Sequence, residues 1–260
     1  MGVTAPAVSR DSIVRIATYN VHKCRGMDRR VLPDRIAGIL RELNADVIAL
    51  QEVISVDDGA GPTGADALPE RDQPRFIADV LGGYQCYFGE NRRIRGAPYG
   101  NAILSRLPVR FTRNYDLSSG IRERRGCLRA DVEVGGTSLH IFNVHLGTGF
   151  IERRRQARLL LSDSILRRVD LQGPSVVVGD FNEWTKGLAT RLMATHYDSI
   201  NMRLFGGGTR TYPGMFPVFH LDHFYFDRRL QLKDFQLCRS RACLVASDHL
   251  PMVADFRLPG

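Results

Sequence analysis

The chain has 260 residues, of which 43% are hydrophobic, 8% aromatic and 25% charged, as in an ordinary soluble globular protein. No apolar run approaches the roughly 20 residues that a membrane span needs, which excludes a transmembrane helix. The 36 Lys and Arg residues against 28 Asp and Glu residues give a formal net charge of +8. This charge favours contact with polyanions such as nucleic acid, anionic lipid or phosphorylated small molecules.

The first third of the chain predicts two strands that alternate with two helices. In chain order these are a strand over 14–20, a helix that Pro33 opens, a strand over 47–50 and a helix over 76–81. The second strand is a short apolar run that ends in Gln51 and Glu52, as expected for a buried strand that carries polar residues at its tip. The stretch 57–73 is rich in Gly, Pro and Asp and predicts a surface loop.

Strands dominate the rest of the chain. Alternating or uniformly apolar segments between turn residues predict strands over 84–89, 101–105, 109–115, 128–134, 138–144, 176–178, 224–226 and 252–256. Gly135 and Gly136, between two alternating segments, are a strong hairpin signal. One long Arg-rich helix is predicted over 151–169.

These elements predict an α+β fold in a single domain over residues 1–260, with residues 1–12 as a flexible N-terminus. No segment repeats at a fixed period and no linker divides the chain. We expect two mainly antiparallel sheets packed face to face, with the helices on the outside. A doubly wound parallel sheet is less favoured because the central hairpin is antiparallel.

The five cysteines are odd in number and form no CxxC pair, which argues against a disulfide framework or a thiolate zinc site. Residues 1–10 lack the basic and apolar segments of a secretory signal. Both features predict a cytoplasmic enzyme.

Carboxylate, amide and imidazole side chains stand at or beside the ends of six predicted strands. They are Asn20, Glu52, Asn143, His145, Asp180, Asn182, Asp222, His223, Asp248 and His249. One such motif alone, for example Asp180-Phe181-Asn182, is more often a turn or a helix cap than a site. Six of them in one chain are much harder to explain as caps, and strand tips can converge on one edge of a sheet to build a pocket.

These motifs resemble, in order, those of the endonuclease/exonuclease/phosphatase superfamily. They are TYNVH at 18–22, LQEV at 50–53, NVHL at 143–146, GDFN at 179–182, LDH at 221–223 and SDHLP at 247–251. The superfamily includes pancreatic-type deoxyribonuclease, apurinic/apyrimidinic endonucleases, neutral sphingomyelinases and inositol-polyphosphate phosphatases. The resemblance runs from about residue 15 to residue 256, with segments 99–106 and 123–126 similar to a bacterial branch. It implies a four-layered α/β sandwich and the hydrolysis of phosphate esters.

The resemblance also implies a divalent cation, Mg²⁺ first and Mn²⁺ as the alternative. Glu52 would be its main ligand, with Asn20 and Asp248 close to the metal or its waters. This assignment suits a hard cation, which prefers one or two carboxylates and keeps several waters.

The same resemblance assigns catalytic roles to five residues. Asp180 would orient and deprotonate the attacking water, and Asn182 would hydrogen-bond a phosphate oxygen. His249, held by Asp222 through one ring nitrogen, would meet the phosphoryl group with the other. His145 would donate to the phosphate or the leaving group. Truncating one of these side chains is expected to lower the rate about 10²-fold or more.

Family members carry a mid-chain Tyr or Arg that contacts the phosphate. Arg122, Arg124 and Arg125 compete for this role; Arg125 is slightly favoured, Arg124 is kept as a second candidate, and a solvated loop is the alternative. Asn143 is also assigned to substrate binding.

Several residues near the motifs receive non-catalytic interpretations. His223 is expected to pack away from the site because strand alternation points it to the other face, and His22 and Lys23 are expected to line the rim. Arg153–Arg155 predict a solvated helix face, with a polyanion track as the alternative, and the Arg cluster at 92–95 a loop that could reach substrate. The aromatic residues that could stack on bases are assigned mainly to the core: Trp184, Tyr212, Phe216 and Phe219.

Three functions stay open. The first is a metal-dependent phosphodiesterase or nuclease, which the positive charge favours. The second is a phosphohydrolase that acts on a phospholipid headgroup or a small phosphorylated metabolite. The third, an inactive binding module of the same fold, is disfavoured because none of the expected catalytic residue types is missing. The expected partner is a phosphate-ester substrate, with nucleic acid as a candidate, and the sequence indicates no stable protein partner.

Overall fold

The computed structural model describes residues 13–56, 71–184, 187–200 and 209–259. Within these ranges the strands form two six-stranded sheets. In spatial order, the first sheet contains β11 (Gln231–Leu237), β12 (Met252–Arg257), β1 (Ile13–Asn20), β2 (Val47–Ile54), β4 (Ala97–Ser105) and β3 (Gln85–Ile94). The second contains β5 (Val109–Asp116), β6 (Gly126–Val134), β7 (Thr137–His145), β8 (Ser175–Asp180), β10 (Asp222–Phe226) and β9 (Asp198–Ser199). Only β1–β2 and β7–β8 are parallel among these described pairs.

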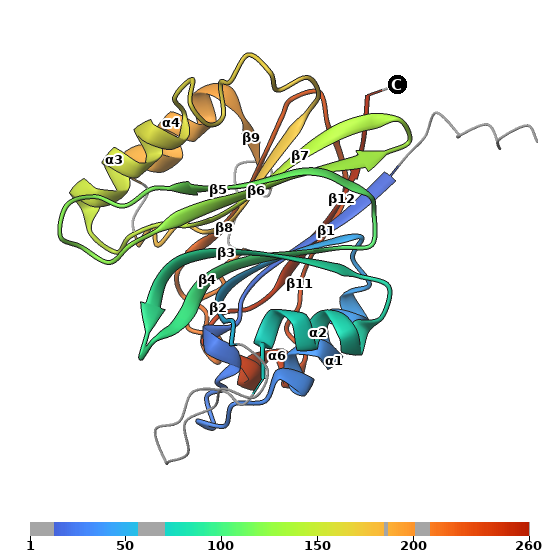
Figure 1. Cartoon of the computed structure of the whole chain (residues 1–260), viewed down its shortest axis with the longest axis vertical. Helices are drawn as coiled ribbons and strands as arrows, with labels where there is room; N and C mark the ends of the chain where they lie inside the picture. The colour runs from blue at the N-terminus through green and yellow to red at the C-terminus, as the bar shows by residue number, and fades with distance from the viewer. Residues whose placement is uncertain (1–12, 57–70, 185–186, 201–208, 260) are drawn as a thin grey trace, which may run out of the picture.

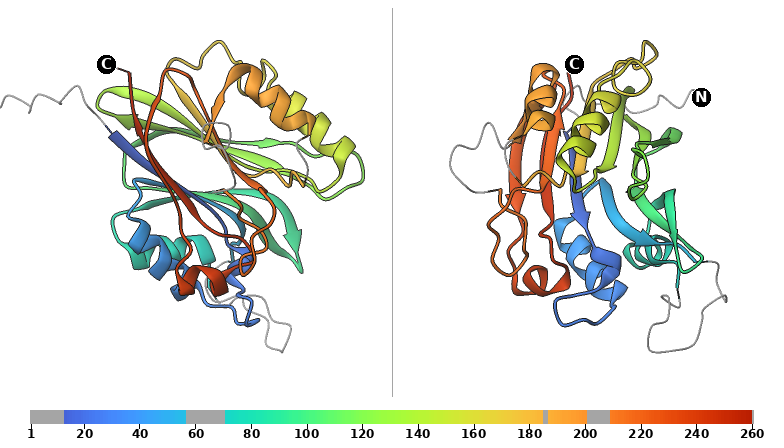
Figure 2. Two further views of the ribbon diagram at one scale, coloured as in Figure 1. Left: turned by 180° about the vertical axis from the view of Figure 1, so that it is seen from behind. Right: turned by 90° about the vertical axis from the view of Figure 1, so that its left-hand side faces the viewer.

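The two sheets pack face to face, and helices cover their outer faces (Figures 1 and 2). The first sheet is covered by α1 (Pro33–Leu43), α2 (Gln73–Leu81) and α6 (Arg241–Ala246). The second is covered by α3 (Phe150–Leu160) and α4 (Leu188–His196). This four-layered sandwich confirms the predicted fold class. None of the described helices is long and apolar enough to span a membrane.

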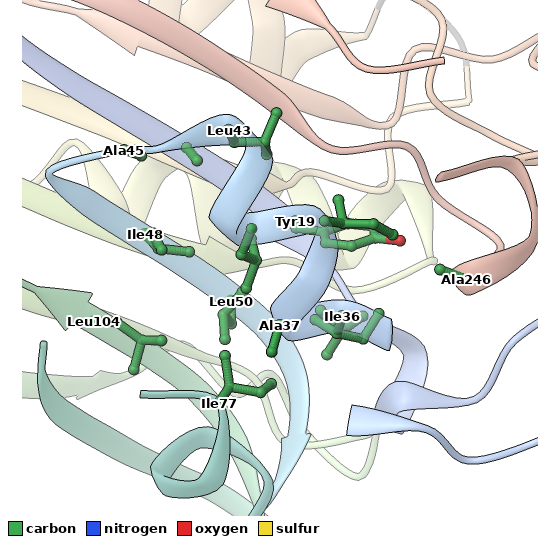
Figure 3. Close-up of a cluster of buried hydrophobic side chains, with 14 of the residues drawn as sticks. Tyr19, Ile36, Ala37, Leu43, Ala45, Ile48, Leu50, Ile77, Leu104 and Ala246 are labelled. Carbon is green, nitrogen blue, oxygen red and sulfur yellow. The ribbon is translucent and has the colours of Figure 1, made fainter. Parts of the chain in front are cut away.

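The apolar face of each strand decides which layer its side chains enter. In β1, Ala17 and Tyr19 point toward the helices and pack with Ile36 of α1 and Ala246 of α6 (Figure 3). The alternate residues of β1, beginning with Val14, join the core between the two sheets. Polar residues that continue this inward alternation therefore lie at the end of the inter-sheet layer.

Most predicted elements are confirmed, with differences at a few boundaries. The helix predicted over 151–169 ends at Leu160, where Ser162 begins a run of turn residues that compete with helical hydrogen bonds. The Arg cluster at 92–95, predicted as a loop, lies largely in β3, which runs to Ile94 before a turn at Arg95 and Gly96. Strand β11 and helices α4 and α6 were not predicted.

Two predictions fall partly outside the described residues. The loop predicted over 57–73 overlaps residues 57–70, which lie outside them, and the part that follows enters α2. The N-terminus predicted to be flexible, residues 1–12, also lies outside them, and the single domain over residues 1–260 stays a prediction.

Candidate active site

Four strands each carry, at one end, a polar side chain that continues their inward apolar face. Val14 and Ile16 precede Asn20 in β1, and Leu139 and Ile141 precede His145 in β7. The two further polar ends are Asp180 after Val176 and Val178 in β8, and Asp222 before Phe224 and Phe226 in β10. Strand register brings them together, because Asp180 pairs with His145 on one side and with Asp222 on the other. The predicted convergence of strand tips is therefore present in the structure.

Glu52 reaches the site by a different route. Strand alternation in β2 turns Gln51 inward, where its amide donates to Asn143 Oδ1 at 2.7 Å. Glu52 would then face the helices, but its φ of 58° is left-handed and the register with β4 shifts between Leu50 and Val53. This bulge re-aims the carboxylate into the site, as bulges beside active sites often do.

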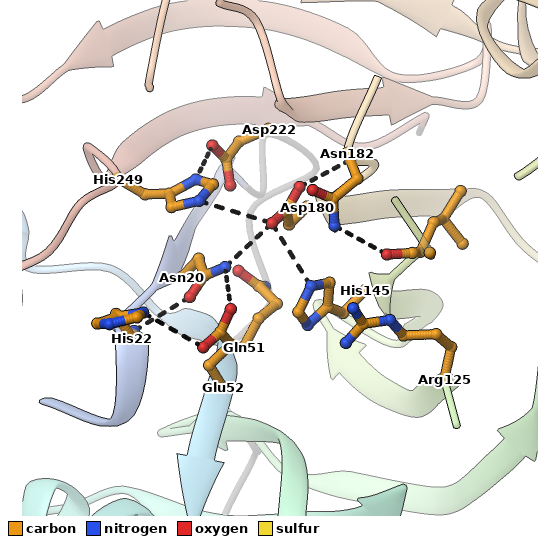
Figure 4. Close-up of polar contacts among 12 residues, drawn as sticks. Asn20, His22, Gln51, Glu52, Arg125, His145, Asp180, Asn182, Asp222 and His249 are labelled. Carbon is orange, nitrogen blue, oxygen red and sulfur yellow. Dashed lines mark hydrogen bonds and ion pairs between the residues drawn. The ribbon is translucent and has the colours of Figure 1, made fainter. Parts of the chain in front are cut away.

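The Asp180 carboxylate lies at the centre of the site (Figure 4). Its Oδ2 accepts a hydrogen bond from Asn20 Nδ2 at 3.0 Å, and the Nε2 atoms of His145 and His249 lie 3.6 and 3.7 Å away. Its Oδ1 accepts from the backbone N–H of Asn182 at 2.7 Å. The two ring contacts are longer than hydrogen bonds. The ring nitrogens are therefore close enough to share a substrate oxygen with Asp180 without already being bonded to it.

The two histidines of the site have opposite environments. Burial lowers the pKa of His249, but Asp222 and Asp180 outweigh this effect and raise it to about 10. His249 Nδ1 lies 2.7 Å from Asp222 Oδ2. Burial, aided by Arg125, lowers the pKa of His145 to about 4. One ring is thus held as an imidazolium and the other as a neutral imidazole, a division typical of sites that separate acid and base roles.

The surroundings of Asp180 disfavour its ionised form. Burial raises the pKa of Asp180 above its ordinary value, and Asp222 adds to this effect, while His249 and His145 oppose it. A buried carboxylate with a raised pKa is a stronger proton acceptor than an exposed one, which suits a general base.

Glu52 has close cationic and polar neighbours. Its Oε1 accepts from Asn20 Nδ2 at 3.2 Å, and its Oε2 accepts from Lys23 Nζ at 3.0 Å. His22 Nδ1 lies 3.5 Å from Glu52 Oε2 and 3.6 Å from Asp248 Oδ1. Burial opposes ionisation of Glu52, but His22, His145 and Lys23 outweigh it and hold the pKa well below the usual value. Glu52 is therefore an anion in this site.

Two sets of side chains have the donor chemistry for a divalent cation. Asp180, Asp222 and His249 are buried, with donor atoms within 4.8 Å of one another. In this set, however, the short contact with Asp222 already engages His249 Nδ1. Glu52 and Asp248 each present a carboxylate oxygen within 3.6 Å of His22 Nδ1, a set that fits a hard or borderline cation. Asn20 directs its amide N–H groups at Glu52 and Asp180, so it orients both carboxylates.

The three residues assigned to substrate binding have different environments in the structure. Arg125 is buried beside His145, with its Nη1 donating to Glu123 and its Nε without a partner among the described residues (Figure 4). Arg124 is exposed. Asn143 is fully buried, and its amide donates to Leu50 O and Ala102 O at 2.8 Å each. Asn143 thus connects the two sheets and presents no free group to a substrate, which departs from its predicted role.

Asn182 is consistent with a contact to phosphate. Its φ of 49° is left-handed, and one amide N–H donates to Leu146 O at 2.9 Å, which leaves a second N–H for a substrate. His223 packs as predicted, edge-on to Phe181 and stacked on Tyr225.

Other expectations around the site were wrong. Arg153 is buried and donates to the Gly147 and Thr148 carbonyls, so only part of the predicted solvated Arg face exists. Trp184, Phe216 and Phe219 are exposed by 38%, 76% and 37%, although they were assigned mainly to the core. Long-range contacts decide whether such aromatic residues are buried, and local periodicity does not reveal those contacts.

His22 and Lys23 were expected only to line the rim, and Ser247 was given no role from the sequence. Ser247 Oγ donates to Asn20 O at 2.7 Å and fixes the loop that carries Asp248 and His249. Position was the only available signal, since His22 and Lys23 directly follow the Asn20 strand tip and Ser247 directly precedes Asp248.

Comparisons with known proteins give a consistent result. The Endonuclease/Exonuclease/phosphatase family matches residues 17–249. The uncharacterized protein YbhP of Escherichia coli (strain K12) is 30% identical over 248 residues, which are 94% of this chain and 96% of that protein.

Solved structures share the fold. An endonuclease/exonuclease/phosphatase from Beutenbergia cavernae DSM 12333 superposes with a TM-score of 0.76 at 25% identity, over 96% of this chain and 72% of that one. D. rerio TDP2, solved with a single strand DNA product, superposes with a TM-score of 0.70 at 17% identity, over 95% of this chain and 99% of that one. The second likeness is one of fold alone.

Proposed function

The chain belongs to the endonuclease/exonuclease/phosphatase family, and from this premise we propose that it is a divalent-metal-dependent phosphodiesterase that acts on nucleic acid. The observation that carries the proposal is the buried Asp180 carboxylate, with the Nε2 atoms of His145 and His249 at 3.6 and 3.7 Å. A proton acceptor and two ring nitrogens around one point suit in-line attack on a phosphoryl group, which needs an oriented nucleophile and stabilisation of charge on the phosphate oxygens.

In this proposal each side chain has one task. Asp180 accepts the proton of the attacking water, and the His249 imidazolium donates to a phosphate oxygen. Asp222 fixes the tautomer and orientation of His249 through the 2.7 Å contact. Asn20 holds Asp180 and Glu52 in register with each other.

Other groups would neutralise the phosphate. Glu52 and Asp248 would hold the cation, either Mg²⁺ or Mn²⁺, which neutralises charge on the phosphate and assists departure of the leaving oxygen. Arg125, buried beside His145, would add a second positive charge near the phosphate.

A single strand with accessible bases is the substrate that the surroundings favour. Tyr212 packs against the His249 ring, with centroids 5.0 Å apart, and Trp184 packs edge-on to both Tyr212 and Phe219. Exposed aromatic faces beside a reaction centre bind bases by stacking, and the +8 charge favours the polyanionic backbone. The likeness to D. rerio TDP2 supports only the fold on which this rests.

A phospholipid headgroup is the second candidate substrate. Met215, Phe216 and Val218, which follow Tyr212, are exposed by 48%, 76% and 54%. Such apolar side chains would also suit an acyl-chain region. A small phosphorylated metabolite needs neither surface and is the remaining alternative.

A panel of substrates tests these proposals. A chromogenic phosphodiester, a chromogenic phosphomonoester, single-stranded and plasmid DNA, and sphingomyelin vesicles are each assayed with Mg²⁺, Mn²⁺ or EDTA. We expect hydrolysis of single-stranded DNA that EDTA abolishes and that Asp180→Asn lowers by about 10²-fold or more. Activity that survives EDTA, or an Asp180→Asn protein as fast as the wild type, would contradict the mechanism.

Aromatic variants separate the substrates. Trp184→Ala is expected to lower kcat/KM for single-stranded DNA about tenfold, since base stacking contributes about 1–3 kcal/mol per base. The same change should leave the small phosphodiester nearly unaffected. Phe111→Ala, an exposed aromatic residue on β5, is the matched control. Intact DNA together with hydrolysed vesicles would replace the nuclease proposal by the lipid one.

We also propose a cytoplasmic location. It is supported by the five cysteines, all of which are free. Fractionation of the host cell with a tagged chain would test it.

A further inference from the structure

The turn that follows Asn20 carries a lysine into the group of residues that would hold the cation. Lys23 Nζ lies 3.0 Å from Glu52 Oε2 and 3.5 Å from His22 Nδ1. The ammonium therefore lies beside both a carboxylate oxygen and an imidazole nitrogen, which are themselves 3.5 Å apart and are two donor types that also bind divalent cations. Lys23 is one of three lysines in a chain whose other basic residues are arginines, and an ammonium is the more compact charge.

A turn with an unusual backbone conformation places Lys23 beside Glu52. His22, Lys23 and Cys24 have φ values of 46°, 59° and 58°, so three successive residues are left-handed. The buried Gln73 holds this turn against β2, because its amide donates to Lys23 O at 2.7 Å and its oxygen accepts from Ile54 N at 2.9 Å. Strained backbone persists only where its surroundings over-determine it, and it concentrates at functional sites.

We propose that the Lys23 ammonium is an internal competitor for the cation position that Glu52, Asp248 and His22 define. A divalent cation lies about 2.0–2.6 Å from a carboxylate oxygen. A cation held by Glu52 would add a second positive charge beside the ammonium, and two such charges close together repel strongly. Cation binding and the Lys23–Glu52 ion pair therefore exclude each other.

The competitor is able to leave without disturbing the fold. The Lys23 side chain is 31% exposed and ends a flexible four-carbon stem, whereas the Glu52 side chain is only 16% exposed. The backbone contacts of the turn run through Lys23 O rather than through the ammonium. As a consequence, a higher cation concentration is needed for binding. Glu52 stays paired with Lys23 until the cation concentration is high enough to displace the ammonium.

Measurements of cation binding without substrate test the inference, because the affinity is expected to rise in one variant and to fall in another. Mn²⁺ affinity of the full chain is measured by calorimetry and by electron paramagnetic resonance. Lys23→Met is expected to bind Mn²⁺ about fivefold more tightly, the scale of a partly exposed ion pair. His22→Asn, which tolerates the left-handed backbone, is expected to bind about tenfold more weakly. Lys233→Met and His196→Asn, on exposed positions away from the site, are the matched controls and should leave the affinity unchanged.

A second readout follows Lys23 directly. With isotopically labelled lysine, the side-chain NMR signal of Lys23 should move when Mg²⁺ is added, while that of Lys233 should stay in place. A purely structural lysine would not respond in this way.

Three outcomes would overturn the inference. The first is a Lys23→Met protein that binds Mn²⁺ as the wild type does or more weakly. The second is loss of binding in Asp222→Asn with binding intact in Glu52→Gln, which assigns the cation to the Asp180, Asp222 and His249 group. The third is a wild-type chain that binds no Mn²⁺.

The inference depends on the proposed function only for the expectation of a divalent cation. If the predicted binding pattern is observed but no phosphate ester is hydrolysed, the proposed function fails and the inference stands. If esters are hydrolysed only when a divalent cation is present but Lys23→Met binds Mn²⁺ no more tightly than the wild type, the proposed function stands and the inference fails.

Discussion

Asp222→Asn removes one negative charge from the reaction centre and almost no volume. Asp222 and His249 are both buried, and the 2.7 Å contact joins Oδ2 to Nδ1. An amide oxygen can still accept from Nδ1, so the ring keeps its orientation while its counter-charge is lost. The other Asp222 oxygen, Oδ1, has no hydrogen-bond partner among the described residues, so replacing it breaks no further hydrogen bond.

The magnitude follows from the burial of the pair. Removing one partner of a buried ion pair costs about 3–5 kcal/mol. The pKa of His249, which Asp222 and Asp180 raise to about 10 against the effect of burial, should fall. If the imidazolium meets the phosphate in the transition state, this energy appears in the barrier. Since about 1.4 kcal/mol is tenfold in rate, kcat/KM should fall by about 10²- to 10⁴-fold.

The chain contains a matched control pair. Asp131 Oδ1 lies 2.7 Å from His140 Nδ1, also buried, on β6 and β7 but away from the Gly126–His145 end that borders the site. Asp131→Asn should lower the stability and leave kcat/KM unchanged at a temperature where the variant is folded. The assay is steady-state hydrolysis of the chromogenic phosphodiester with an unfolding curve for each protein. An Asp222→Asn rate within tenfold of the wild type, or equal losses in both variants, would refute the reasoning.

Three further predictions concern the polar interior. Burial raises the pKa of Asp131, but His140 and Arg129 outweigh it and hold the pKa below its usual value. The wild type should therefore lose stability as the pH falls below about 4, and Asp131→Asn should flatten that part of the acid unfolding curve; an unchanged curve would contradict this. Asn143→Ala should lower the free energy of unfolding in urea by about 3–5 kcal/mol, and exposed Asn114→Ala by about 1 kcal/mol or less. Lost substrate affinity with normal stability would instead support a binding role for Asn143. Asp180→Asn should lose turnover without a lower unfolding midpoint, because burial raises the pKa of Asp180 and makes its ionised form costly; a clearly lower midpoint would argue against this.

Strand alternation accounts for the part of the site that was predictable. In β8 the inward residues Val176 and Val178 are apolar, and the next inward residue is Asp180. The same two-residue alternation leads from the buried inward residues of β1 to Asn20 and from those of β7 to His145. Local sequence is sufficient here because one period governs both the core and the site.

Alternation fails where the environment is set by distant segments. Asn143 and His145 point inward from the same strand. The Asn143 amide, however, donates both its N–H groups to the backbone carbonyls of Leu50 and Ala102, far away in the sequence, and has none left for a substrate. Whether an inward polar side chain faces a substrate or the opposite sheet depends on that partner, which no local pattern contains. The same limit applies to Arg125, which is buried while its neighbour Arg124 is exposed.

Backbone strain explains the residues that periodicity could not place. Of the eight described non-glycine residues with positive φ, five lie in or beside the site: His22, Lys23, Cys24, Glu52 and Asn182. Each left-handed residue costs about 1–2 kcal/mol, so their concentration must be offset by surrounding contacts. For the turn, those contacts are made by Gln73, and for Asn182 by the Leu146 carbonyl. The regular strands deliver Asp180, and the strained positions deliver Glu52 and Lys23 to the same point. A site of this kind needs both, because a regular sheet alone would have turned Glu52 toward the helices.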